Sequence, residues 1–353
     1  MPTVLFAWRR TPPPLLIGGA EVTQQLLAEE FAAAGWQAVY LGSHQAPWDQ
    51  AEQLPQTSAF LDSQGTSYEE SHGVLRYRWN GVDCIAVPQN QIASTLRSLL
   101  SQVRPDVVFT SQEGAADLAE QARPAALVAG ILHSVSKTGL GVLAGHPHYG
   151  LAVSEFVRQR APRTDRTRLA VLHPPFTLPQ QQGPGVPRTG SVLMVNPIPA
   201  KGSDLLHQLI HVMPEQHFTL VEGWWNTADQ FAAHPNVTYV PRVYDMSPLY
   251  RGHRLLLVPS TVEDAFPRVI IEAALHGTPS IGADRGGIPE AIGTAGIVLP
   301  RVAEPQAWAD AIRSTDHQSL GEQARQHAAR FTQPRLPTLE ALGIYPSAKA
   351  SST

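Results

Sequence analysis

Apolar residues recur along the chain with two different periods, which predict strands and helices in turn. Residues 4–8 form a short apolar run typical of a buried strand, and residues 21–34 carry apolar side chains at helical spacing. Gly35 stands where a helix commonly ends, and residues 37–41 supply a second apolar run. This strand–helix–strand unit is typical of a parallel sheet, which takes ligands at the carboxyl ends of its strands.

The alternation continues along most of the chain, interrupted once by a hairpin and once by a linker. Asn80-Gly81 separates the apolar runs 75–79 and 82–87, which predicts a two-residue hairpin because both turn positions tolerate positive φ. Residues 174–190 are rich in proline, glutamine and glycine, a composition typical of a linker. Further strands are expected at residues 106–110, 126–132, 151–154, 192–195, 218–222, 237–240, 255–258 and 280–282, and further helices at 92–100, 115–121, 155–160, 204–212 and 267–276.

We therefore predict an α/β fold with two doubly wound, Rossmann-like domains. The N-terminal domain spans residues 1–178 and the C-terminal domain residues 188–334. The tail, residues 335–353, is expected to pack back on the N-terminal domain and then fray. The two domains are expected to face each other across a cleft that takes the ligand.

Composition excludes several classes of protein. The 353 residues are 43% hydrophobic and 16% charged, which is typical of a folded globular protein. The net charge of -4 argues against a nucleic-acid binder, which needs basic residues for the phosphates. Cys84 is the single cysteine, so no disulfide can form within the chain and a cytoplasmic location is expected. The first apolar run is too short to span a membrane, and peripheral membrane contact is left open.

The segment 255–290 has the pattern of a ligand site. A loop that holds Asp264 follows the expected strand, and Pro267 is placed as the first residue of the next helix because its fixed φ suits that position. Glu272 follows within an apolar helix, where a carboxylate needs a partner. The start of a helix presents free N–H groups and the positive end of the dipole. This layout suits a phosphorylated sugar.

Two further patterns concern charge and metals. The chain has three lysines among its 26 basic residues, and Lys201 follows an expected strand together with Gly202. Because lysine is rare in this chain and Lys201 follows an expected strand, Lys201 is a candidate for contact with a phosphate. His146 and His148 have no clear third ligand, so we predict no metal site.

Several motifs occur in a fixed order over most of the chain: Gly18-Gly19-Ala20-Glu21, Val153-Ser154-Glu155-Phe156-Val157, Lys201-Gly202, Asp264-Ala265-Phe266-Pro267-Arg268 with Glu272-Ala273, Gly277-Thr278-Pro279 and Gly286-Gly287-Ile288-Pro289-Glu290. In this order they resemble glycosyltransferase family 4, the glycosyl transferases group 1, which are retaining enzymes. The resemblance implies the GT-B fold, in which two Rossmann-like domains flank a cleft.

The resemblance also implies a role for each matching residue. Glu272 would hold the ribose hydroxyls of a nucleotide sugar. Asp264 and Lys201 would act in catalysis, the first near the transferred sugar and the second by offsetting charge on the leaving diphosphate. His133 would lie near the sugar as a third catalytic residue, and Gly19 would allow a close backbone approach to the donor or acceptor.

The remaining donor contacts come from three short segments. Phe266, Pro267 and Arg268 would lie against the sugar and the phosphates. Arg242 and Val243 fall where the base is usually contacted. Asn196 completes the donor-binding set, at a position where the family has an arginine.

The function implied is transfer of a hexosyl group from a nucleoside diphosphate sugar to a hydroxyl acceptor, with retention of configuration. The nucleotide would bind the C-terminal domain and the acceptor the N-terminal one. No metal and no cofactor beyond the donor are expected, because Lys201 and the helix dipole offset the phosphate charge. Two alternatives stay open. One is a nucleotide-sugar epimerase on the same scaffold. The other is a non-catalytic sugar-nucleotide binding protein, which is favoured by two departures from the family: Asp264 stands where the family has a glutamate, and Asn196 where it has an arginine.

Overall fold

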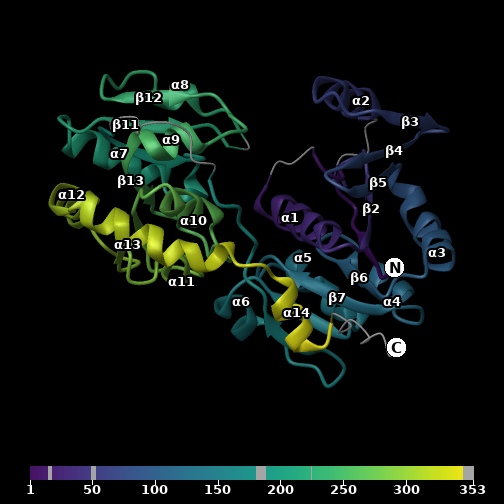
Figure 1. Ribbon diagram of the computed structural model, residues 1–353. Helices are drawn as coiled ribbons and strands as arrows, with labels where there is room; N and C mark the ends of the chain where they lie inside the picture. The colour runs from purple at the N-terminus through teal and green to yellow at the C-terminus, as the bar shows by residue number, and fades with distance from the viewer. Residues whose placement is uncertain (15–17, 49–52, 180–187, 224, 345–353) are drawn as a thin grey trace. The chain divides into compact units, whose positions relative to one another are not determined.

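The computed structural model describes residues 1–14, 18–48, 53–179, 188–223 and 225–344 (Figure 1). The chain divides into two compact units. Unit 1 consists of Met1–Pro175 together with the residues from Pro334 onward, and unit 2 consists of Phe176–Gln333. Residues 180–187 of the predicted linker and residues 345–353 of the predicted tail lie outside the described residues.

Unit 1 is built on one large sheet. Its described strands are β1 (Thr3–Ala7), β2 (Gln37–Ser43), β3 (Tyr68–Ser71), β4 (Val74–Trp79), β5 (Val82–Val87), β6 (Val107–Thr110), β7 (Leu127–Leu132), β8 (Tyr149–Ala152) and β9 (Arg168–Val171). They follow the order β3-β4-β5-β2-β1-β6-β7-β8-β9. Neighbours from β5 to β9 run parallel, and β5-β2-β1-β6-β7-β8 is the doubly wound Rossmann order. The antiparallel strands β3 and β4 extend the sheet at β5.

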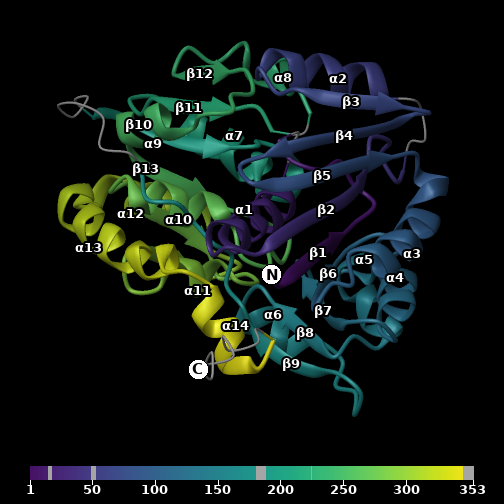
Figure 2. The same ribbon diagram turned by 45° about the vertical axis from the view of Figure 1, so that its right-hand side comes forward.

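Helices cover both faces of this sheet. The described helices of unit 1 are α1 (Gly19–Ala33), α2 (Leu54–Ser63), α3 (Ile92–Gln102), α4 (Ala115–Ala122), α5 (Lys137–Leu140), α6 (Glu155–Arg160) and α14 (Leu336–Leu342). Figures 1 and 2 show α1 on one face and α3 and α4 on the other. Helix α14 is tied to unit 1 by two hydrogen bonds: the Tyr149 hydroxyl donates to the Leu342 carbonyl over 2.7 Å, and the Leu336 N–H donates to Glu30 Oε1 over 2.8 Å.

Aromatic side chains form the core under α1. The Phe6 ring on β1 stacks on Phe109 at 5.0 Å and on Tyr40 at 5.7 Å between ring centroids. Phe31 of α1 completes the group, 5.7 Å from Phe109, and all four side chains are fully buried. Burying each such ring contributes about 1.5–3 kcal/mol. The apolar runs of β1, β2 and β6 thus hold α1 against the sheet.

Unit 2 repeats the doubly wound design. Its described strands are β10 (Thr189–Val195), β11 (Phe218–Val221), β12 (Val237–Val240), β13 (His253–Val258), β14 (Ser280–Ala283) and β15 (Ile297–Leu299). They are all parallel and follow the order β12-β11-β10-β13-β14-β15, which is again that of a Rossmann fold. In both units the strand order reverses next to the first strand.

The helices of unit 2 pack around its sheet. Those described are α7 (Ser203–Val212), α8 (Ala228–Phe231), α9 (Ser247–Gly252), α10 (Arg268–Leu275), α11 (Ile288–Ile292), α12 (Pro305–Ser314) and α13 (His317–Ala329). Leu206 and Leu209 of α7 and Trp308 and Ile312 of α12 share one buried cluster with Leu220 of β11. Within the described residues, no helix is long and apolar enough to cross a membrane.

The predicted α/β class and the predicted hairpin are confirmed. Asn80 and Gly81 have φ values of 45° and 84°, as the turn between β4 and β5 requires. The expected strand 151–154 lies two residues earlier, as β8, because the Ser154 side chain caps α6 by accepting from the Val157 N–H over 3.2 Å.

Other differences have equally local causes. Pro267 is not the first residue of its helix but precedes it, with φ -71° and ψ 105°, and α10 begins at Arg268. Strand β3 was not predicted because its residues are polar and nearly all exposed. Helix α13 was not predicted because its buried face consists of small residues, Gly321, Ala324 and Ala328.

Candidate functional site

Two loops of unit 2 meet where its strand order reverses, between β10 and β13. The loop after β13 lies along the loop after β10, because the Thr261 N–H donates to the Ala200 carbonyl over 3.1 Å and its hydroxyl donates to the Pro199 carbonyl over 3.1 Å. Carboxyl strand ends at such a reversal are where open α/β sheets take ligands. These loops carry Lys201 and Asp264.

Lys201 and Asp264 form an ion pair between the two loops. The Lys201 ammonium donates to Asp264 Oδ1, and the Ser260 hydroxyl donates to Asp264 Oδ2 over 2.6 Å. The Lys201 and Asp264 side chains are 31% and 15% exposed. Both oxygens of Asp264 therefore already have a donor, and a ligand can still reach the pair from solvent.

Glycines allow the loops to approach this closely. Gly202 has a φ of 91°, and a Cβ there would lie 2.3 Å from the Pro259 carbonyl oxygen. The Gly287 N–H donates to the Asp264 carbonyl over 2.6 Å. A Cβ on Gly287 would lie 2.0 Å from the Ala265 carbonyl oxygen. The motif that begins at Gly286 thus fixes the backbone that carries Asp264.

Glu272 on α10 is held by two donors. Its Oε1 accepts from Arg268 Nε over 3.1 Å, and its Oε2 accepts from the Tyr250 hydroxyl of α9 over 3.0 Å. Burial raises the pKa of Tyr250 well above its ordinary value, and Glu272 raises it further, so Tyr250 keeps its proton. The Glu272 side chain is 32% exposed, so its remaining lone pairs are accessible to a ligand.

Arg268 faces the interior of unit 2. Its guanidinium lies 4.1 Å from the centre of the Phe176 ring, and its side chain is 9% exposed. Burial lowers the pKa of Arg268, an effect that the Glu272 carboxylate opposes. Arginine stays charged in either case. The charge of Arg268 is therefore directed at Glu272 and Phe176.

Phe266 and Pro267 precede α10, and the side chain of Phe266 packs inside unit 2. The Phe266 ring is 7% exposed and packs at 5.3 Å from Phe331 and 6.4 Å from Phe176. Pro267 has no N–H to donate. Helix α10 therefore presents at its start the backbone N–H groups of the residues from Arg268 onward.

Asn196 and Arg242 meet at Gly223, beyond the ends of β10, β11 and β12. Asn196 has a φ of 59° and its N–H donates to the Val221 carbonyl over 2.8 Å, while its Oδ1 is buried with no partner among the described residues. Arg242 Nε donates to the Gly223 carbonyl over 2.8 Å. A Cβ on Gly223 would lie 2.3 Å from Asn196 Cγ. Val243 beside them is 37% exposed.

The other two predicted residues belong to unit 1. Gly19 is the exposed first residue of α1. His133 follows β7, and its ring stacks on Trp8 at 6.3 Å with an interplanar angle of 12°. The structure therefore groups Lys201 with Asp264, Glu272 with Arg268, and Asn196 with Arg242, all in unit 2.

Sequence reasoning missed two residues of this site. Ser260 binds Asp264, and the Pro259-Ser260 pair that follows β13 and precedes the Asp264 motif was the available signal. Tyr250 binds Glu272 from α9, a helix that was not predicted. Pro248 near the start of α9 was the available signal for that helix.

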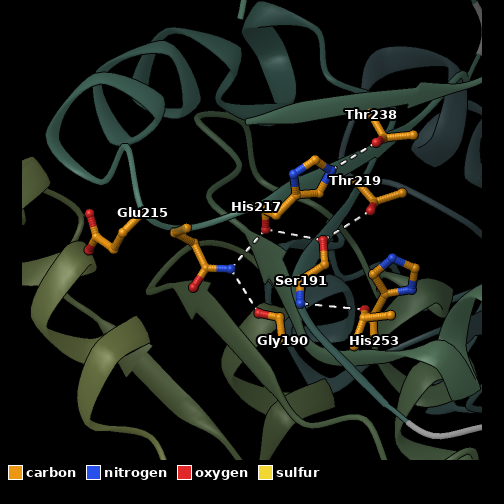
Figure 3. Close-up of a pocket in the computed structure, with 9 residues that line it drawn as sticks. Gly190, Ser191, Glu215, His217, Thr219, Thr238 and His253 are labelled. Carbon is orange, nitrogen blue, oxygen red and sulfur yellow. Dashed lines mark hydrogen bonds between the residues drawn. The ribbon is translucent and has the colours of Figure 1, made fainter. Parts of the chain in front are cut away.

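A pocket of about 440 Å³ lies at the amino ends of the strands of unit 2, opposite the carboxyl ends that carry Lys201 and Asp264 (Figure 3). None of the predicted residues lines it. It is lined by Thr189, Gly190, Ser191, Glu215, Gln216, His217, Thr219, Thr238 and His253. In the part of the chain that the structure describes, no three His, Cys, Asp or Glu side chains are grouped to hold a metal ion.

Solved glycosyltransferase structures share this architecture. A glycosyltransferase from Rickettsia africae superposes with a TM-score of 0.71, at 16% identity, over 98% of each chain. Anabaena HepE in complex with UDP and glucose superposes with a TM-score of 0.69, at 17% identity, over 97% of this chain and 100% of that one. The two Rossmann-like units thus define the GT-B fold, and this prediction is confirmed.

Sequence comparison adds the family. Residues 191–315 match the family described as Glycosyl transferases group 1. The chain is 36% identical over 95 residues to the D-inositol 3-phosphate glycosyltransferase of Corynebacterium kroppenstedtii, which is 25% of this chain and 21% of that protein. It is 29% identical over 152 residues to that of Mycolicibacterium gilvum, 38% and 34% of the two chains. This matched segment is about a third of the chain, and the chain matches about a fifth to a third of the length of these curated relatives.

Proposed function

We propose that this protein transfers a sugar from a nucleoside diphosphate sugar to a hydroxyl acceptor, with retention of configuration. The observation that carries the proposal is the Lys201–Asp264 pair at the point of strand-order reversal in unit 2, which joins the loop after β10 to the loop that leads into α10. The structure of HepE with UDP and glucose supports a nucleotide sugar as the donor class. The named relatives are glycosyltransferases, so neither the epimerase nor the binding-protein alternative is favoured.

Lys201 would stabilise the leaving group. As the bond between the anomeric carbon and the phosphate oxygen breaks, negative charge grows on the diphosphate, and a preorganised ammonium counters it. We infer that an arriving diphosphate takes Lys201 from Asp264. Asp264 would then accept hydrogen bonds from sugar hydroxyls while Ser260 holds its other oxygen. The dipole of α10 adds positive potential on the same side.

Glu272 would bind the ribose. Arg268 and Tyr250 fix its two oxygens, so the carboxylate is oriented before the ligand arrives. Arg242, Val243 and Asn196 lie beyond the ends of the neighbouring strands and would contact the nucleotide from there.

For retention, the acceptor oxygen attacks the anomeric carbon from the face that the phosphate leaves. The new carbon–oxygen bond forms as the old one breaks, and a phosphate oxygen takes the acceptor proton. Because Lys201 and the start of α10 offset the charge, the proposed reaction requires no metal ion. Transfer should therefore continue in EDTA, and its loss there would refute this part of the proposal.

The test of the function is a ligand screen followed by turnover. UDP, GDP and ADP and their glucose and mannose conjugates are added to the full chain, and the melting temperature is recorded. A ligand at about 100 times its dissociation constant adds about 2.7 kcal/mol of stability. Transfer from the stabilising donor is then followed by NMR, which reports the anomeric configuration. If none of these compounds raises the melting temperature, the proposed function is wrong, and release of an epimerised donor without acceptor would favour the epimerase.

A further inference from the structure

Unit 1 has its own point of strand-order reversal, between β1 and β6, and charged side chains follow both strands. Arg10 comes three residues after the end of β1, and Glu113 comes three residues after the end of β6. Glu21 reaches the same place from the first turn of α1. This carboxyl edge is where an open α/β sheet takes a ligand.

One guanidinium here faces two carboxylates. Arg10 Nε and Nη2 donate to the two oxygens of Glu113 over 3.0 and 2.8 Å, and Nη1 donates to Glu21 Oε1 over 2.6 Å. The Glu113 side chain is 26% exposed and that of Glu21 is 7% exposed. Arg10, Glu21 and Glu113 together carry one surplus negative charge, and the Glu113 oxygens keep lone pairs for further donors.

Two tryptophans contact the same guanidinium. Arg10 Cζ lies 5.4 Å from the centre of the Trp8 ring and 5.2 Å from that of Trp48. Trp8 is fully buried, whereas Trp48 is 65% exposed. A cation–π contact therefore holds an indole at the sheet edge with most of its apolar surface in water. Because Arg10 touches both Trp48 and Glu113, the aromatic face and the carboxylate can meet one ligand.

We propose that Trp48 and Glu113 bind the acceptor and that this acceptor is an uncharged carbohydrate. This inference rests on the glycosyl transfer proposed above. A sugar ring has an apolar C–H face, which suits the Trp48 indole, and a rim of hydroxyls, which donate to Glu113. A carbohydrate can therefore contact the exposed aromatic face with its C–H groups and the partly exposed carboxylate with its hydroxyls.

The same charges disfavour a phosphorylated acceptor. A phosphate in contact with Trp48 would lie near Glu113 and Glu21, and like charges at short range repel. Arg10 cannot offset this, because its charge is already matched by the two carboxylates. The other arginine of this segment, Arg9, donates to Gln89 Oε1 over 3.4 Å and lies against Gly114.

The test uses acceptor pairs that differ only in a phosphate. Glucose is compared with glucose 6-phosphate, mannose with mannose 6-phosphate, and inositol with inositol 3-phosphate, in transfer from the donor that stabilises the full chain. We expect kcat/KM to be higher for the uncharged member by about tenfold or more, the effect of one close like-charge contact. Preference for the phosphorylated members would overturn the assignment.

Two variants locate the site. Trp48→Ala should raise the acceptor KM about tenfold and leave the donor-induced thermal shift unchanged, and Trp48→Phe should restore most of the affinity. Glu113→Gln should raise the same KM, whereas Glu69→Gln, which removes an exposed carboxylate from β3, should not.

Failure of this inference differs from failure of the proposed function. If no nucleotide sugar binds, glycosyl transfer itself is wrong and the acceptor site falls with it. If the donor binds and Trp48→Ala leaves the acceptor KM unchanged, or no uncharged sugar accepts transfer, the acceptor assignment alone is wrong.

Discussion

The Lys201 ammonium donates to the Asp264 carboxylate and so joins the loop after β10 to the loop after β13. Ser260 holds the second carboxylate oxygen over 2.6 Å. The two charges neutralise each other while the site is partly exposed. In the proposed function an incoming diphosphate would therefore compete with Asp264 for Lys201, and donor binding would release the carboxylate.

Replacing Lys201 should impair turnover more than binding. We expect Lys201→Ala to lower kcat by about 10²–10³-fold, because the charge on the leaving group is greatest in the transition state. Steady-state kinetics with the stabilising donor gives kcat and KM separately. Lys137→Ala, which removes an exposed lysine from α5, is the control and should match the unmodified protein. Equal loss of activity in both variants would contradict the assignment.

Replacing Glu272 should abolish the donor-induced thermal shift. Glu272→Ala removes the group proposed to bind the ribose and also leaves Arg268 buried without its carboxylate, so the ligand-free protein should lose about 1–3 kcal/mol. The readout is the difference in melting temperature with and without donor, which separates binding from stability.

The matched control for this experiment is Glu322→Ala, since Glu322 also pairs with an arginine of its own helix but on an exposed surface. Its effect on stability should be within about 0.5 kcal/mol. An unchanged donor shift in Glu272→Ala would remove Glu272 from the site.

A methyl group at Gly287 should displace the loop of Asp264. The added Cβ would lie 2.0 Å from the Ala265 carbonyl oxygen, so the backbone on either side must move. We expect Gly287→Ala to weaken donor binding by about tenfold or more, at a cost of about 1–3 kcal/mol in stability. Isothermal titration gives the affinity and urea unfolding the stability. Gly252→Ala is the control, because a Cβ there meets nothing within 4 Å, and the prediction is wrong if the two variants bind the donor equally.

Unit 2 should lose stability in mild acid. Burial lowers the pKa of His253, with nearby His217 adding to the effect, and burial followed by Arg251 lowers the pKa of His276. The unfolded chain then binds these protons more tightly than the folded chain. The stability that the neutral rings confer is present above a pH of about 6.5 and is lost as the pH falls below it.

Urea unfolding between about pH 7.5 and 5.5 measures this loss, and His253→Gln should reduce its slope with pH. The exposed His72→Gln serves as the control. A free energy of unfolding that stays constant or rises toward pH 5.5 would contradict the explanation.

Local sequence patterns specify the order and type of most helices and strands. These patterns extend over a few residues, so they can be read without knowing the fold. Examples are the apolar periods of β1, α1 and β2, the turn at Asn80-Gly81 and the glycine after α10. The motif around Asp264 and Glu272 likewise carries the resemblance to the glycosyl transferases group 1, because its residues are close together in the chain and lie in the matched segment 191–315.

Which side chains contact one another depends on the packing of distant segments. Lys201 and Asp264 lie 63 positions apart, and Tyr250 lies 22 positions from Glu272 on a helix that its sequence did not predict. The packing of Arg268 against Phe176, far away in the chain, likewise could not be read from local sequence. Such pairings depend on packing between distant segments, which local periodicity does not encode.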